Sequence, residues 1–180
     1  MKPFAAILSV AVLLAFLVLP GSALDWKVLT VSERSLSLDL GPSIEIYGKD
    51  LNVSGKGMVS QDFLINDTAQ AGAAYLSVMS IYDQVMRRLD PGMLTEIFLT
   101  GGIMALESRG DVEIGNWTAT DSTGANVTVH TLQAKDPRLA QLSGTYEIAC
   151  WNLDGSTYAL MASMLDKNTT RQVIENLTIT

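Results

Sequence analysis

Apolar and polar residues alternate in several short segments of the chain, as they do in strands that bury one face. Leu36, Leu38 and Leu40 alternate with polar residues, and residues 44–47 follow a Gly41-Pro42 turn. Residues 58–65 and 74–82 are apolar runs of strand length. The pattern therefore predicts four strands in the first half of the chain.

The fourth of these segments has a second interpretation. Leu76, Met79, Val85, Met86 and Leu89 also keep a helical spacing. We expect a strand that ends near Tyr82, followed by irregular or short helical chain.

A helix is predicted to start at Asp90-Pro91, which supplies a capping side chain and a proline at the first helical position. Gly110 is the expected end of this helix. Gly101 and Gly102 in its middle indicate either close approach of the helix to a sheet or a break. One apolar face is predicted from Leu94, Ile97, Phe98, Met104 and Ala105.

Two hairpins and a final helix follow. One hairpin turns at 122–124, with a bulge at Gly115, and the other turns at Asp154-Gly155. Thr169 is the expected cap of the last helix, whose buried stripe is Val173, Ile174 and Leu177. Residues 177–179 alternate as a last strand.

These elements predict an α+β fold: a single domain with an antiparallel sheet of about six or seven strands and helices packed on its faces. A helix ending in "SRG", two hairpins that include "YEIACWNLDGSTYALMASML", and then "NTTRQVIENLTI" follow one another. In this order of elements, roughly residues 36–180 resemble the sandwich of the photosystem II extrinsic protein P family, the PsbP-like fold. The resemblance implies an exported or assembly-assisting protein that binds rather than catalyses, and it carries over no site residue.

The first residues have the composition of an export signal. Lys2 precedes an apolar run from Ala5 to Leu19, which Pro20-Gly21 ends, and Ala23 offers a cleavage point. The run is shorter than the roughly 20 residues of a spanning helix. We predict a signal peptide at 1–23 and an exported domain at 24–180, with an uncleaved membrane anchor as the alternative. Both interpretations place the domain outside the cytoplasm, secreted or at the cell surface.

The charge balance argues against nucleic acid as a partner. Removal of residues 1–23 takes away Lys2 and no acidic residue, which changes the formal net charge from −7 to −8. Phosphate binding needs a clustered basic face, and Arg87-Arg88 is the only adjacent basic pair. The expected partner is a protein or another envelope component, and the membrane enters only through an uncleaved N-terminus.

Asparagines are followed by the N-glycosylation pattern far more often than chance predicts. Serine and threonine make up 30 of 180 residues, so about one sequon is expected among seven asparagines. The alternative is that threonine-rich strands and turns generate the pattern. Six asparagines are predicted glycosylation sites: Asn52, Asn66, Asn116, Asn126, Asn168 and Asn176.

The residues for catalysis are sparse. His130 is the only histidine and Cys150 the only cysteine. In the alternating strand His130 lies on the same face as the sequon residue Asn126, which predicts that it points to solvent. The apolar context of Cys150 predicts burial, so the two residues form a poor catalytic pair. We therefore predict no metal, no cofactor and no enzyme, but a non-catalytic binding or envelope-assembly module.

The alternative function is an extracytoplasmic hydrolase that uses a carboxylate pair such as Glu113 and Asp121. The binding module needs a contact surface, and the segment from Tyr75 to Leu94 is where we expect one, because it carries no sequon. Core burial is the ordinary explanation for its methionines and aromatic residues.

Overall fold

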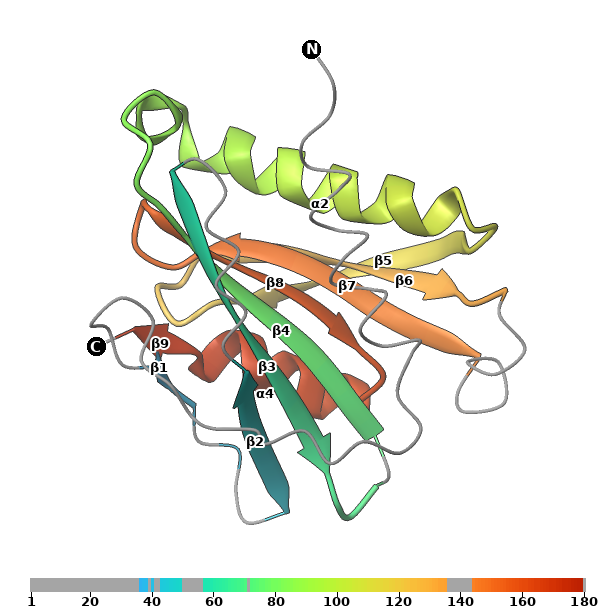
Figure 1. The fold of residues 1–180 in the computed structure, drawn as a ribbon. Coiled ribbons are helices and arrows are strands. Elements are labelled where there is room, and N and C mark those ends of the chain that lie inside the picture. Colours follow the sequence, from blue (N-terminus) through green and yellow to red (C-terminus); the bar gives the residue numbers. More distant parts are fainter. Residues whose placement is uncertain are drawn as a thin grey trace.

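Seven antiparallel strands form one sheet in the order β2-β3-β4-β8-β7-β6-β5 (Figure 1). The computed structural model describes residues 36–38, 40, 43–49, 57–70, 72–135 and 144–179, so the predicted signal peptide and Asn52 lie outside the described residues. The strands of this sheet are β2 Ile44–Lys49, β3 Met58–Asp67, β4 Gly72–Ile81, β5 Val112–Thr120, β6 Asn126–Gln133, β7 Thr145–Asn152 and β8 Thr157–Ser163.

Two helices pack on the sheet, and a short second sheet lies beside it. The helices are α2 Pro91–Glu107 and α4 Lys167–Asn176, and a 3-10 turn, η1 Met86–Arg88, precedes α2. The second sheet pairs β1 Leu36–Ser37 with β9 Thr178–Ile179. The predicted α+β fold with an antiparallel sheet of six or seven strands is confirmed.

The two helices cover opposite faces of the sheet, one above it and one below it in Figure 1. Alternate residues of β7 show this division, because successive side chains of a strand point to opposite faces. Ile148 and Cys150 pack in one apolar cluster with Phe98 of α2. Ala149 and Trp151 pack in the other cluster, which contains the predicted α4 stripe of Val173, Ile174 and Leu177. Each helix therefore closes one layer of core.

The glycines of α2 mark a close approach to the sheet and no break. The helix runs without interruption from Pro91 to Glu107, and Gly102 is buried in it. A Cβ atom at Gly102 would lie 3.1 Å from Cδ1 of Ile148 on β7. The absence of a side chain there lets the helix backbone lie directly on the sheet.

The predicted apolar face of α2 was too wide. Leu94, Phe98 and Ala105 are buried as expected, but Ile97 and Met104 are exposed. At 100° per residue, Ile97 and Met104 lie about 100° from their neighbours Phe98 and Ala105, which is enough to turn them away from the sheet. The helix thus carries a second apolar stripe on its outer side.

The predicted cap of the last helix was also wrong. Asp166 caps α4, and its carboxylate accepts hydrogen bonds from the amides of Asn168 (2.9 Å) and Thr169 (3.2 Å). The hydroxyl of Thr169 donates to the same carboxylate. Asp is at least as good a cap as Thr, and its negative charge is favourable at a helix N-terminus. These hydrogen bonds hold the pKa of Asp166 below its usual range.

Other local predictions are confirmed. The register of β5 and β6 shifts between Glu113 and Gly115, as a bulge requires. Gly124 and Gly155 have positive φ in the two hairpin turns, which favours glycine. After β4, η1 is the short helical segment that we expected beyond Tyr82.

Substitution of Gly102 tests the close approach of α2 to β7. Gly102→Val adds bulk against Ile148, and we expect the free energy of unfolding to fall by about 1–3 kcal/mol, the usual cost of overpacking. Gly115→Val is the matched control, because a Cβ at Gly115 meets nothing within 4 Å. Urea denaturation measures both variants. Equal stability of the two would contradict the packing described here.

Candidate functional site

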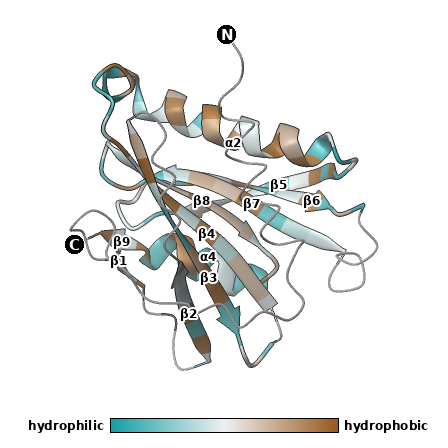
Figure 2. Ribbon diagram, viewed as in Figure 1, coloured by the Kyte–Doolittle hydropathy of each residue, from teal (hydrophilic) through white to brown (hydrophobic). Residues whose placement is uncertain are grey.

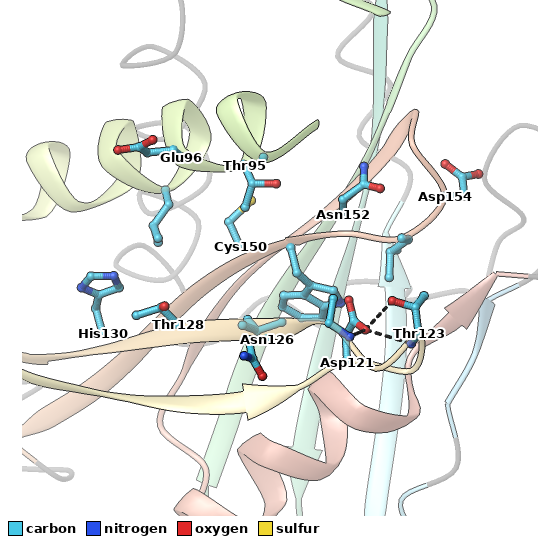
Figure 3. Close-up of a pocket in the computed structure, with 16 residues that line it drawn as sticks. Thr95, Glu96, Asp121, Thr123, Asn126, Thr128, His130, Cys150, Asn152 and Asp154 are labelled. Carbon is cyan, nitrogen blue, oxygen red and sulfur yellow. Dashed lines mark hydrogen bonds between the residues drawn. The ribbon is translucent and has the colours of Figure 1, made fainter. Parts of the chain in front are cut away.

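A groove lies between the first half of α2 and the polar face of the β5–β6 hairpin (Figure 3). Its volume is about 760 Å³. Thr95 and Glu96 of α2 line one side and Thr128 and His130 of β6 the other, while Cys150 of β7 lies at the floor. Because no lysine or arginine lines it, the groove does not suit an anion.

His130 lies in this groove and is less exposed than the sequence predicted. Its side chain is 19% exposed, and Nδ1 lies 2.7 Å from Oε1 of Glu113 on the neighbouring strand. The bulge before Gly115 brings these two side chains together, since it shifts the register between Glu113 and Asn116, the residue paired with His130. The pair ties β5 to β6.

The groove contains both His130 and Cys150, a pair that the sequence analysis had judged poorly placed. Their strands are neighbours and their side chains share a face, so the structure brings them closer than expected. A catalytic pair needs a hydrogen bond between the nucleophile and the base. The ring hydrogen bond described for His130 goes to Glu113, and burial raises the pKa of the Cys150 thiol. This arrangement does not activate the thiol.

Two aspartates at the rim of the groove form hairpin turns. Oδ1 of Asp121 accepts from the Thr123 amide (2.8 Å), the Thr123 hydroxyl (2.7 Å) and the Ala125 amide (2.9 Å). Oδ1 of Asp154 accepts from the amides of Ser156 and Thr157 in the other turn. These bonds are the common reason for aspartate in turns.

The suggested carboxylate pair is not brought together. Glu113 and Asp121 lie eight residues apart along β5 and the turn that follows it. At the rise of an extended strand this is a separation of about 26 Å. Glycosidases need about 5–10 Å between their two carboxyl groups. Glu113 and Asp121 therefore cannot act on one glycosidic bond.

A second polar cluster lies on the α4 face of the sheet. Nε1 of Trp117 donates to Oε1 of Glu147 (2.8 Å), and Lys167 and Arg171 of α4 lie 4.8 and 5.2 Å from the centre of the Trp117 ring. Burial raises the pKa of Glu147, while the Trp117 hydrogen bond and the Lys167 charge act in the opposite direction. These contacts attach α4 to β5.

Five of the six sequon asparagines lie in the part of the chain that the structure describes. Asn116, Asn126, Asn168 and Asn176 are exposed, and Asn66 is half-buried in β3. Asn168 and Asn176 lie at the entrance and the end of α4. Asn126 also lines the groove. The four exposed sites are open to a glycosylating enzyme.

The predicted contact segment Tyr75–Leu94 divides into two parts. Its strand half is core, since Leu76 and Met79 are buried. After β4 most of the apolar side chains are exposed, although Leu94 is buried, and exposed apolar residues continue along α2, where Figure 2 shows bands of hydrophobic colour. We call this the η1–α2 surface: Tyr82, Val85, Leu89, Met93, Ile97 and Met104.

The second half of this surface was not predicted, because the apolar pattern of α2 placed Ile97 and Met104 on the buried face. The spacing of Met93, Ile97 and Met104 at intervals of four and seven was the available signal. It describes a separate stripe, distinct from that of Leu94, Phe98 and Ala105.

Comparisons with protein-family models, curated proteins and solved structures give no match to this chain. The resemblance to the PsbP-like fold therefore stays a prediction. Among the described residues no three His, Cys, Asp or Glu side chains gather as a metal site would require. None of the helices within those residues has the length and apolar composition to cross a membrane.

Labelling of Cys150 tests its burial. The side chain is 3% exposed, so a bulky maleimide should leave the folded protein unmodified and react only after denaturation in urea. Met93→Cys is the matched control, because Met93 is 51% exposed and its replacement should be labelled at once. Mass spectrometry counts the labels. Rapid modification of the unaltered protein would refute the burial of Cys150.

Proposed function

We propose that this protein is an exported, N-glycosylated, non-catalytic module of the cell exterior that binds another protein surface through its η1–α2 surface. The observation that carries the proposal is the exposure of six large apolar side chains along one continuous stretch of chain. Val85 is 73% exposed, Met104 63% and Met93 51%.

Because these apolar side chains are exposed, the folded chain lacks the stabilisation that their burial would contribute. Burial of a Leu, Ile, Val or Met side chain contributes about 1.5–3 kcal/mol relative to exposure. Single exposed apolar residues are common, but a contiguous set indicates an interaction site. The η1–α2 surface is such a set, and binding of an apolar partner would recover part of that energy.

The sequons support the same choice of surface. Glycans are bulky and hydrophilic, so a protein contact is favoured where they are absent. No sequon occurs between Asn66 and Asn116, the stretch that includes η1 and α2. The apolar leader and the six sequons together support a location outside the cytoplasm.

Hydrolysis is the weaker candidate. The groove under α2 is lined by polar and apolar side chains, but Asp121 and Asp154 at its rim are engaged in turns and Glu113 is engaged with His130, which leaves Glu96 without a second carboxylate beside it to form a catalytic pair. We therefore extend the proposal to binding and not to a reaction.

A photoreactive amino acid on the η1–α2 surface tests the proposed contact. Benzoyl-phenylalanine at Ile97 should form a cross-linked adduct of defined mass when cells of the native host are irradiated. The same amino acid at Gln172, an exposed position of α4, is the control and should form none. Equal yields at the two positions, or none at Ile97, would contradict the proposal.

Mass spectrometry of the native protein tests glycosylation. We expect glycans at Asn116, Asn126, Asn168 and Asn176, and lower occupancy at half-buried Asn66, because the glycosylating enzyme needs an accessible acceptor. Thr118→Ala should remove the glycan of Asn116 alone. Thr120→Ala, an exposed threonine outside any sequon, should remove none. Unmodified peptides across all these sites would refute this part of the proposal.

A further inference from the structure

One of the predicted glycosylation sites lies in the groove under α2. Asn126 and Thr128, the first and third residues of one sequon, both line the groove and are both exposed. They lie two residues apart on β6, so their side chains point to the same face of the sheet. A sugar on Asn126 would therefore leave the strand on the side where the groove is.

The other exposed sequon asparagines are not among the residues that line the groove. Asn168 and Asn176 belong to α4, which covers the opposite face of the sheet. Asn116 pairs with His130 and shares the face of the groove, but it lies on β5, the edge strand of the sheet. A glycan on Asn116 can extend past this edge into solvent, whereas Asn126 lies on an inner strand.

The groove offers hydrogen-bonding groups that suit a neutral sugar. Thr95 and Glu96 of α2 lie across the groove from the two sequon residues (Figure 3). Sugar hydroxyls can donate charge-assisted hydrogen bonds to a carboxylate, and a threonine hydroxyl both donates and accepts. Leu99 adds apolar surface to the same wall. Because no lysine or arginine is present in the lining, nothing there favours an anionic ligand over a neutral one.

Size and attachment both favour a glycan as the occupant of the groove. The volume of about 760 Å³ falls within the range of about 300–1,000 Å³ that is typical of small-ligand sites, so the first sugars have room. A group attached to the lining itself is present at an effective concentration on the order of mM. Weak contacts then suffice to keep it in place, and a free ligand would have to compete with it.

We propose that the N-linked glycan of Asn126 lies in the groove between α2 and the β5–β6 hairpin, and that its first sugars fill this groove. The inference rests on the glycosylation in the proposed function. The glycan covers Leu99 on α2 and His130 on β6, so the groove of the glycosylated protein is closed to a diffusing ligand.

Hydroxyl-radical footprinting of the protein from its native host tests the location of this glycan, whatever its sugars are. Leu99 and His130 should be oxidised about threefold faster in Asn126→Gln protein than in unaltered protein, because an occupant of such a site covers most of the lining. Met104, on the outer side of α2 and 63% exposed, is the internal reference. It should be oxidised at the same rate in both proteins.

Matched variants separate the effect of the glycan from that of the side chain that carries it. Thr128→Ala destroys the sequon and should expose Leu99 as Asn126→Gln does, whereas Thr128→Ser preserves the sequon and should keep Leu99 protected. Asn168→Gln removes a sequon from the opposite face of the sheet and should also leave Leu99 protected.

Mass spectrometry of the same samples distinguishes the two kinds of failure. A glycan on Asn126 together with equal oxidation of Leu99 in all the variants would overturn this inference alone and leave glycosylation standing. Asn126 without a glycan would also overturn the inference, and glycosylation as proposed fails only if the other exposed sites are unmodified too. The η1–α2 surface is tested independently by the cross-linking at Ile97.

Discussion

The close approach of α2 to β7 at Gly102 is the contact on which the surfaces of this protein depend. With Gly102 against Ile148, and Leu94, Phe98 and Leu106 buried in the same cluster, the rotation of α2 about its own axis is fixed. That rotation turns Met93, Ile97 and Met104 outward. It also leaves the groove between the first half of α2 and the β5–β6 hairpin. One helix thus closes the core, borders the groove and presents the α2 part of the η1–α2 surface.

The polar side chains around the groove illustrate why composition alone is a poor guide to catalysis. Asp121 and Asp154 are acceptors for the backbone of tight turns, and Glu113 holds His130 across two strands. A carboxylate that satisfies several donors is held in one geometry by the fold itself. Cys150 lies under the helix, where burial disfavours the thiolate. Asp121, Asp154, Glu113 and His130 thus all contribute to the structure of the two hairpins.

The sequence predicted those features that depend on neighbouring residues. Alternation located the strands, glycines located the turns, and the change of parity at Gly115 located the bulge, because each is a local property of the chain. The errors arose where local signals compete. Asp166 and Thr169 are both good caps, and only the course of the chain from β8 selects Asp166. Likewise α2 has apolar residues on more than one side, so periodicity could not say which stripe faces the sheet. The pairing of Glu113 with His130 depends on register and was not predictable.

The surface of this molecule combines features that favour solubility with features that favour association. A chain with a net charge of −7 and six sequons is suited to staying dissolved and separate, whereas the six exposed apolar side chains of the η1–α2 surface favour association. These features are compatible because most of the exposed apolar residues lie on other elements than the exposed sequons. The exposed sequons lie on β5, β6 and α4, whereas the η1–α2 surface lies on α2 and in the segments just before η1 and α2. Two further exposed apolar residues, Val112 and Ile114, lie on β5. Glycans on the first set would block contacts there without touching the second. Such glycans would disfavour contacts on their own faces, and contacts would be favoured at α2, which carries no sequon.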